Sequence, residues 1–162
     1  CDGTVNYFGQ ILDLDEALAD LLEHIEFDRS PFTDLNHCSE DGVDIGLIEG
    51  GLCNAENVEV LRAFRDQCRV LVAVGACAIT GGLPALRNHL DVGDMLQAVY
   101  GQVPNDPELP LPLNRVLPIH EVVEIDYSLP GCPPPADAFW QLLQDLMAGR
   151  EPALHKGLIR YD

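Results

Sequence analysis

The chain has 162 residues, 47% of them hydrophobic, which is enough for one domain with a packed core and too few to suggest two. Its formal net charge of −18, with nine Lys and Arg in total, argues against a nucleic-acid partner and against binding to an anionic membrane surface. No apolar run approaches the roughly 20 residues that span a bilayer, and nothing at the start resembles a signal peptide, so we expect a cytoplasmic protein.

The first half of the chain alternates helix-type and strand-type patterns. Apolar residues at helical spacing predict an amphipathic helix over 12–25, and the run 25–34 indicates a short strand. The segment 43–51 predicts another strand, which closes on two glycines. A helix follows it, with Asn54 as the expected N-cap residue.

The second half continues the alternation. The valine-rich segment 70–75 predicts a strand buried on both faces of a parallel sheet, and strand, helix and strand in this order indicate βαβ units. Several prolines in 105–121 predict an extended connection with little regular structure. A strand over 122–129 and an amphipathic helix over 136–146 close the chain.

Four cysteines are expected at one edge of this sheet. Cys53, Cys77 and Cys132 each follow a predicted strand by a few residues, and ligands of open parallel sheets bind beyond the carboxyl ends of the strands. Cys1 would share that edge if an upstream strand led into it. Four thiolates from separate loops suit an iron-sulfur cluster or a structural zinc ion, but zinc sites usually contain paired C-x2-C motifs, which this sequence lacks.

The other two cysteines are expected to pack as small hydrophobic residues. Cys38 lies in a loop whose side of the sheet is not determined by the pattern. Cys68 ends a predicted helix just before a strand, which places it at the opposite edge. Because six cysteines are too few for a disulfide-stapled fold of this size, we expect no disulfide framework.

Several segments together resemble the small subunit of soluble NAD-reducing NiFe hydrogenases, nearly from end to end. They are "LDLDEAL", "SPFTD", "VDIGLIEGG", "VLVAVGACAITGGLPALRN", "IHEVVEIDYSLPGCPPPADAFW" and the terminal "YD". The wider superfamily includes small subunits of other NiFe hydrogenases and the cluster-carrying subunit of respiratory complex I. The resemblance implies a flavodoxin-like α/β fold, a doubly wound parallel sheet forming a single domain over 1–162.

The resemblance also implies a cofactor and partners. It implies one 4Fe-4S cluster, proximal to a NiFe site that resides in a separate large subunit, with flavin- and NAD-binding diaphorase subunits as further partners. The expected role is electron transfer between hydrogen oxidation and the NAD-reducing flavin module. FMN in this chain is conceivable, because flavodoxin-like sheets bind it at the same edge, but no phosphate loop is visible and the cluster would occupy that crevice.

One departure from the family pattern concerns the cluster ligands. The family carries a C-x-G-C motif at the end of its first strand, whereas Cys1-Asp2-Gly3 is followed here by Thr4 and the strand itself would lie upstream of Cys1. The resemblance thus implies Cys1, Cys77 and Cys132 as ligands, with Cys53 as the candidate for the fourth position or as a cysteine that packs nearby. Thr4 is a poorer candidate because iron in these clusters favours thiolate.

Two further residues have alternative interpretations. Glu49 at a strand end could relay protons or hold the large subunit, or could stabilise its own loop. His120 could lie near the electron-transfer machinery or serve a structural role. The alternative to the electron-transfer function is a cluster-free structural subunit that keeps the fold and the large-subunit interface: Thr4 favours it, and the intact "GACA" and "PGCPP" motifs oppose it.

Overall fold

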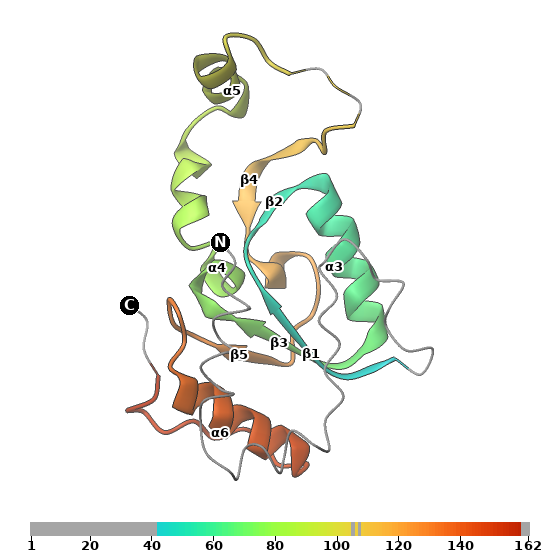
Figure 1. The fold of residues 1–162 in the computed structure, drawn as a ribbon, viewed down its shortest axis with the longest axis vertical. Coiled ribbons are helices and arrows are strands. Elements are labelled where there is room, and N and C mark those ends of the chain that lie inside the picture. The colour runs from blue at the N-terminus through green and yellow to red at the C-terminus, as the bar shows by residue number, and fades with distance from the viewer. Residues whose placement is uncertain (1–41, 105, 107, 160–162) are drawn as a thin grey trace.

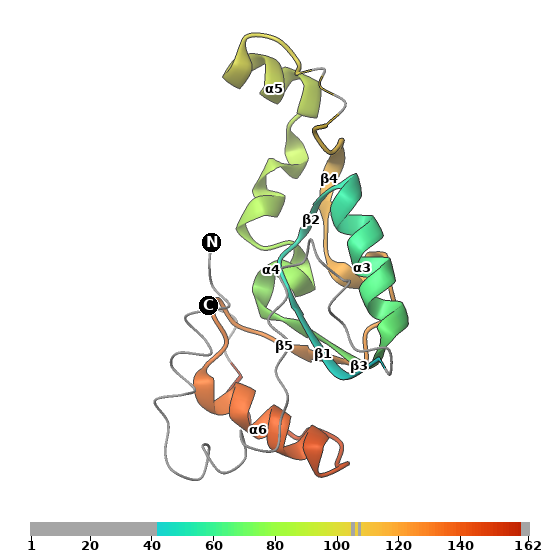
Figure 2. The ribbon, with the colours of Figure 1, turned by 45° about the vertical axis from the view of Figure 1, so that its right-hand side comes forward.

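The computed structural model of the chain describes residues 42–104, 106 and 108–159. The helix predicted over 12–25 and the strand predicted within 25–34 lie outside these residues. Figures 1 and 2 show a small sheet with helices on both sides and a helical extension that projects from one end.

Among the described residues, the centre of the fold is a three-stranded parallel sheet in the order β1-β3-β5. Its strands are β1 (Val43–Glu49), β3 (Cys68–Val74) and β5 (Tyr127–Leu129). A separate antiparallel pair consists of β2 (Leu52–Asn54) and β4 (Pro112–Leu117). The carboxyl ends of β1, β3 and β5 lie at one edge, because Glu49 pairs with Val74 and Val74 with Leu129.

Helices and short 3₁₀ segments connect the strands. The α-helices are α3 (Ala55–Gln67), α4 (Gly75–Thr80), α5 (Val92–Tyr100) and α6 (Ala136–Met147), and the 3₁₀ segments are η2 (Leu83–His89) and η3 (Ile119–Glu121). The predicted N-cap of α3 is confirmed, because the Asn54 side chain accepts a hydrogen bond from the Asn57 N–H at 2.8 Å. The closing helix is also confirmed, one residue longer than predicted.

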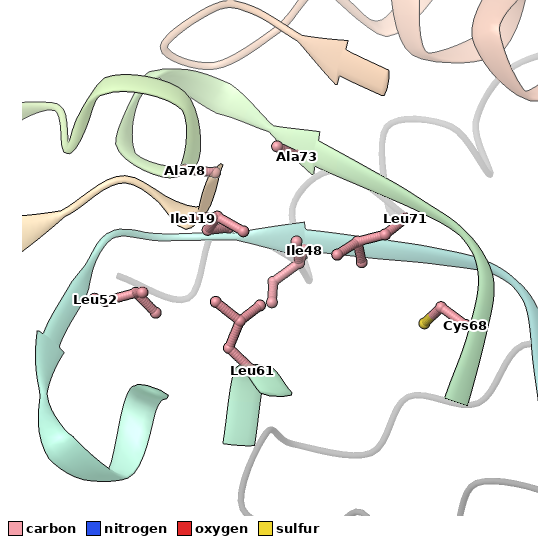
Figure 3. Packing of buried hydrophobic residues seen from close by; sticks show 8 residues of the cluster. All are labelled: Ile48, Leu52, Leu61, Cys68, Leu71, Ala73, Ala78 and Ile119. Atoms are coloured by element: carbon pink, nitrogen blue, oxygen red, sulfur yellow. The ribbon is translucent and has the colours of Figure 1, made fainter. Parts of the chain in front are cut away.

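Strand β3 is buried on both faces, as its apolar run predicted. Leu71 and Ala73 face the α3 side, where they pack with Ile48, Leu61 and other apolar residues (Figure 3). The alternate residues Val72 and Val74 pack against α6 instead. A strand between two helical layers is the arrangement expected of a flavodoxin-like α/β fold, so the predicted fold class is confirmed.

The segments 70–75 and 105–121 differ from their predictions. The strand predicted over 70–75 begins at Cys68 and ends at Val74, because Gly75 has a φ of +82° and starts α4. The segment 105–121 was expected to lack regular structure, but it contains β4 and η3. β4 forms because β2 pairs with it on one side and the Asn88 side chain bonds both backbone groups of Val116.

The strand predicted over 122–129 is regular only from Tyr127. The Asp126 carboxylate accepts the Leu71 N–H at 2.8 Å, and the Asp126 N–H donates to the Leu71 carbonyl at 3.0 Å. A side chain therefore takes the place of a backbone carbonyl at the point where the pairing begins. The preceding residues Val122, Val123 and Ile125 pack against the α3-side core instead.

The helical extension comprises η2, α5 and the residues around them. Figures 1 and 2 show it leading away from the sheet on the side of β4. Several of its large apolar side chains are exposed: Leu83, Leu86, Leu90, Val99, Tyr100 and Val103. Leu83, at its base, adjoins the cysteine edge of the sheet.

Asp145 anchors the chain that follows α6, and we expect its loss to change how stability depends on pH. Its buried carboxylate accepts hydrogen bonds from Gln141, from Arg150 at 2.7 Å and from the Ala153 N–H. The Gln141 hydrogen bond, followed by that of Arg150, lowers the pKa of Asp145 below its ordinary 3.8. A lowered pKa gives stability that is present above the unfolded-state value and is lost as the pH falls through the folded-state value.

Asp145→Asn should therefore unfold more easily than the wild type at pH 7, and the difference should shrink below about pH 4. Urea unfolding at several pH values measures this. Glu151→Gln, which removes a charge from an exposed neighbouring position, is the control and should show no such trend. A difference between wild type and Asp145→Asn that stays constant with pH would contradict the assignment.

Candidate metal centre

Cys77 lies in the first turn of α4, immediately beyond the carboxyl end of β3. Gly75, with its positive φ, turns the chain from the strand into the helix. The Ala76 N–H donates to the Gly131 carbonyl at 2.8 Å, which ties this helix to the loop that carries Cys132. Two loops that are far apart in sequence are thus joined by a backbone hydrogen bond beside both cysteines.

Cys132 follows β5 in the sequence Pro130-Gly131-Cys132 and is exposed. Gly131 has a φ of +142°, and the peptide bond from Cys132 to Pro133 is cis. A Cβ atom at Gly131 would collide with the Pro134 backbone, so the loop can close only around glycine.

Burial and four neighbouring groups shift the pKa of the Cys77 thiol. Burial raises the pKa of the Cys77 thiol most, and the neighbouring Cys132 raises it next, with further contributions from Glu49 and Cys53. A backbone hydrogen bond from Leu83 opposes these effects by stabilising the thiolate. Three thiols and a carboxylate are therefore close enough for their charges to interact, and bound metal cations would neutralise the negative charges that they carry when ionised.

The start of η2 packs closely against Cys77. A Cβ atom on Gly82 would lie 2.6 Å from the Cys77 sulfur and 2.9 Å from its Cα atom. Glycine is thus required for the chain to pass under Cys77 and to present the Leu83 N–H to the sulfur.

Cys53 was expected in a loop, but it lies within β2. Its N–H donates to the Asn57 side chain at 3.1 Å, and its thiol donates to the Gly51 carbonyl at 3.5 Å. Its own carbonyl accepts a hydrogen bond from Arg87 at 3.2 Å. The backbone of Cys53 is therefore fixed on both sides, while its half-buried thiol makes a long hydrogen bond to Gly51.

The remaining predicted residues have different positions. Cys1, Thr4 and Cys38 lie outside the described residues. Cys68 is buried at the amino end of β3, as predicted, where it packs in the α3-side core (Figure 3). Gly46 and Phe64 lie close to its side chain. Glu49 ends β1 and acts on Cys77, whereas His120 is exposed in η3 and is not among the groups that shift the pKa of Cys77.

The residues present, thiols from three separate segments, are of the type that holds an iron-sulfur cluster. Within the part of the chain that the structure describes, no group of three His, Cys, Asp or Glu side chains could hold one metal ion. Thiolates that bind separate irons of a 4Fe-4S cluster are spread more widely than thiolates that share one zinc ion. Cys53, Cys77 and Cys132 come from three separate segments, and the Cys53 and Cys132 thiols both act on the ionisation of Cys77.

Sequence reasoning missed two contributors to this site. Leu83 acts through its backbone N–H, which no side-chain pattern reports. Arg87 reaches Cys53 across 34 positions of sequence, so only the folded chain reveals the contact. The glycine pair before Leu83 was the available signal, since Gly81 and Gly82 both require a positive φ.

Ligands of open parallel sheets bind beyond the carboxyl ends of the strands, and Cys thiolates are the usual ligands of iron-sulfur clusters, so this edge is the candidate metal centre. The family model of the NADH ubiquinone oxidoreductase, 20 Kd subunit, matches residues 8–146. The chain therefore belongs to this family.

Individual relatives are hydrogenase subunits. The chain is 42% identical to the NAD-reducing hydrogenase HoxS subunit delta of Cupriavidus necator, over 93% of this chain and 77% of that protein. It is 32% identical to the iron-sulfur subunit of the F420-non-reducing hydrogenase of Archaeoglobus profundus, over 88% of this chain and about half (52%) of that protein. The predicted resemblance to hydrogenase subunits is thus confirmed.

A solved structure agrees with these sequence matches. A chain in the crystal structure of an NAD+-reducing [NiFe]-hydrogenase in the H2-reduced state superimposes with a TM-score of 0.84 at 53% identity. The match covers 97% of this chain and 92% of that chain. None of the helices among the described residues has the length and apolar character needed to cross a membrane.

Proposed function

We propose that this chain is the electron-transfer subunit of a NiFe hydrogenase, and that it holds one 4Fe-4S cluster proximal to a NiFe site in a separate large subunit. The observation that carries the proposal is the convergence of Cys53, Cys77 and Cys132 at the carboxyl edge of the sheet, where the other two cysteines influence the ionisation of Cys77. The match to a chain of an NAD+-reducing [NiFe]-hydrogenase supports the same assignment.

The overall reaction is the oxidation of hydrogen by NAD+ to give NADH and a proton. Within it, this subunit would connect the large subunit to flavin- and NAD-binding diaphorase subunits. A bound 4Fe-4S cluster supplies one-electron redox chemistry at this position. The cytoplasmic location stays a prediction from the sequence.

The chain's own residues have distinct roles in this proposal. Cys77 and Cys132 supply thiolates from the two loops that the Ala76–Gly131 hydrogen bond joins. Cys1 supplies the third thiolate, and Cys53 is the candidate for the fourth, from β2. The Leu83 N–H donates to the Cys77 sulfur, and hydrogen bonds of this kind stabilise thiolate and raise the reduction potential of a cluster.

Glu49 is the candidate for proton transfer or for contact with the large subunit. It lies at the carboxyl end of β1 and its charge acts on Cys77, so it borders the same site. His120 is a weaker candidate for either role because it is exposed in η3, apart from the groups that act on Cys77. FMN remains a less favoured occupant of this edge than the cluster.

Iron and acid-labile sulfide analysis of the complex, purified anaerobically from its native host, tests the proposal. We expect the chain to co-purify with a much larger partner. The complex should contain more iron than the same complex carrying Cys132→Ser: about four more irons and four more sulfides if the variant loses the cluster, and about one more iron if the variant holds a converted, three-iron cluster. Equal iron and sulfide contents in the two complexes would instead support the cluster-free structural subunit. A stable monomer active in hydrogen oxidation would contradict both functions.

A further inference from the structure

Arg87 is located at the end of η2 and reaches into the β2–β4 pair. Its Nη2 atom donates to the Cys53 carbonyl at 3.2 Å and to the Leu113 carbonyl at 3.0 Å. Its Nη1 atom is buried and has no hydrogen-bond partner among residues 42–104, 106 and 108–159. The guanidinium group therefore links the two strands at the level of Cys53.

The strand pairing explains why Cys53 needs this link. Leu52 pairs with Leu117 and Asn54 with Pro112, so the register shifts between the two pairs and Cys53 lies at the irregularity. At such a position a backbone carbonyl loses its regular partner in the ladder. The Arg87 side chain supplies a donor to the Cys53 carbonyl there.

The position of Arg87 itself is fixed by its neighbour. The Asn88 side chain accepts the Val116 N–H at 2.7 Å and donates to the Val116 carbonyl at 2.9 Å, which holds the end of η2 against β4. The start of η2 presents the Leu83 N–H to the Cys77 sulfur. One seven-residue segment thus contacts Cys77 at its first residue and Cys53 near its last.

We propose that Arg87 is a positioning residue that holds Cys53 in place beside Cys77 and Cys132. It acts through the Cys53 carbonyl, so the thiol can exchange its long hydrogen bond to the Gly51 carbonyl, at 3.5 Å, for a contact with the bound group. This inference rests on the proposed function, because it assigns Cys53 a place at the cluster. Residues that hydrogen-bond a metal-ligating residue, and so fix its orientation, affect metal retention almost as strongly as the ligands themselves.

The test uses the anaerobically purified complex with four variants of this chain. They are Arg87→Met, Arg87→Lys, Cys53→Ala and the double variant Arg87→Met with Cys53→Ala. The rate at which a chelator removes the cluster is followed by its EPR signal. Arg115→Met is the matched control, because Arg115 is exposed on β4, the strand that Arg87 contacts through Leu113.

We expect Arg87→Met to lose the cluster about tenfold faster than the wild type, and Arg87→Lys to recover most of the difference, since lysine can still donate to one carbonyl. The double variant should lose the cluster no faster than Cys53→Ala alone, because Arg87 then has no thiol to position. Arg115→Met should behave as the wild type. A wild-type rate for Arg87→Met, or additive effects in the double variant, would overturn the proposal.

A second measurement applies if Arg87→Met fails to retain any cluster. Alkylation of Cys53 is then compared with that in Cys132→Ser from which a chelator has removed any remaining cluster, because this variant keeps Arg87. We expect Cys53 to react about tenfold faster in Arg87→Met, while the buried Cys68 reacts equally slowly in both. Equal Cys53 rates would overturn the proposal. The absence of a cluster signal from the wild-type complex would contradict the proposed function instead.

Discussion

Replacing Cys77 or Cys132 with serine is expected to remove or convert the cluster and to reduce hydrogen-dependent NAD reduction to below about one-hundredth of the wild-type rate. Both cysteines lie beyond carboxyl ends of strands in the parallel sheet, and the charge of Cys132 acts on Cys77. A serine hydroxyl is a poor substitute because iron in such clusters favours thiolate. EPR spectra and the NAD-reduction assay on the purified complex measure the two effects.

Cys68→Ser is the control for this prediction. Cys68 is buried in the α3-side core at the opposite end of β3, so its replacement should cost about 1–3 kcal/mol of stability by placing a hydroxyl there. The cluster and the assay should be nearly unaffected. Equal losses of cluster in all three variants would show that the two edges of the sheet do not separate these cysteines by function.

Gly82→Ala is expected to disrupt the site without touching any cysteine. The new methyl group would lie 2.6 Å from the Cys77 sulfur and 2.9 Å from its Cα atom, and the residue would have to adopt a φ of +53°. Overpacking costs about 1–3 kcal/mol and the strained backbone about 1–3 kcal/mol more. Urea unfolding should show this loss of stability, and EPR should show loss or alteration of the cluster.

Gly101→Ala separates strain from crowding. Gly101 also has a positive φ, of +75°, but no atom lies within 4 Å of the position that its Cβ would occupy. This variant should lose about 1–2 kcal/mol of stability from the left-handed backbone alone and should keep an unchanged EPR spectrum. If Gly82→Ala and Gly101→Ala gave the same unfolding free energy and the same spectrum, the close packing at Cys77 would be without consequence.

The elements that sequence reasoning identified are those specified locally. The apolar run of β3 indicates burial on both faces wherever it occurs, and Asn54 caps α3 through a contact only three residues away. The placement of Cys77 and Cys132 at one edge followed from the rule that parallel strands bring their carboxyl ends together. These inferences need no knowledge of the tertiary contacts.

The features that were missed depend on distant partners. β4 is a strand because β2 and Asn88 satisfy its backbone, and no local pattern in a proline-rich segment shows this. β5 is short because the Asp126 side chain bonds Leu71, which is 55 positions away. Cys53 was placed in a loop for the same reason, since its pairing with β4 was not foreseen.

The three glycines that surround the cysteines offer a way to interpret natural variation. A Cβ atom at Gly82 or Gly131 would meet atoms already in place, and Gly75 makes the turn between β3 and α4. These restrictions come from the loops that present Cys77 and Cys132, so they are relaxed once a lineage no longer needs a cluster. Among homologues, a residue other than glycine at any of these positions would then indicate a protein that no longer binds a cluster or transfers electrons, even where the cysteines themselves persist.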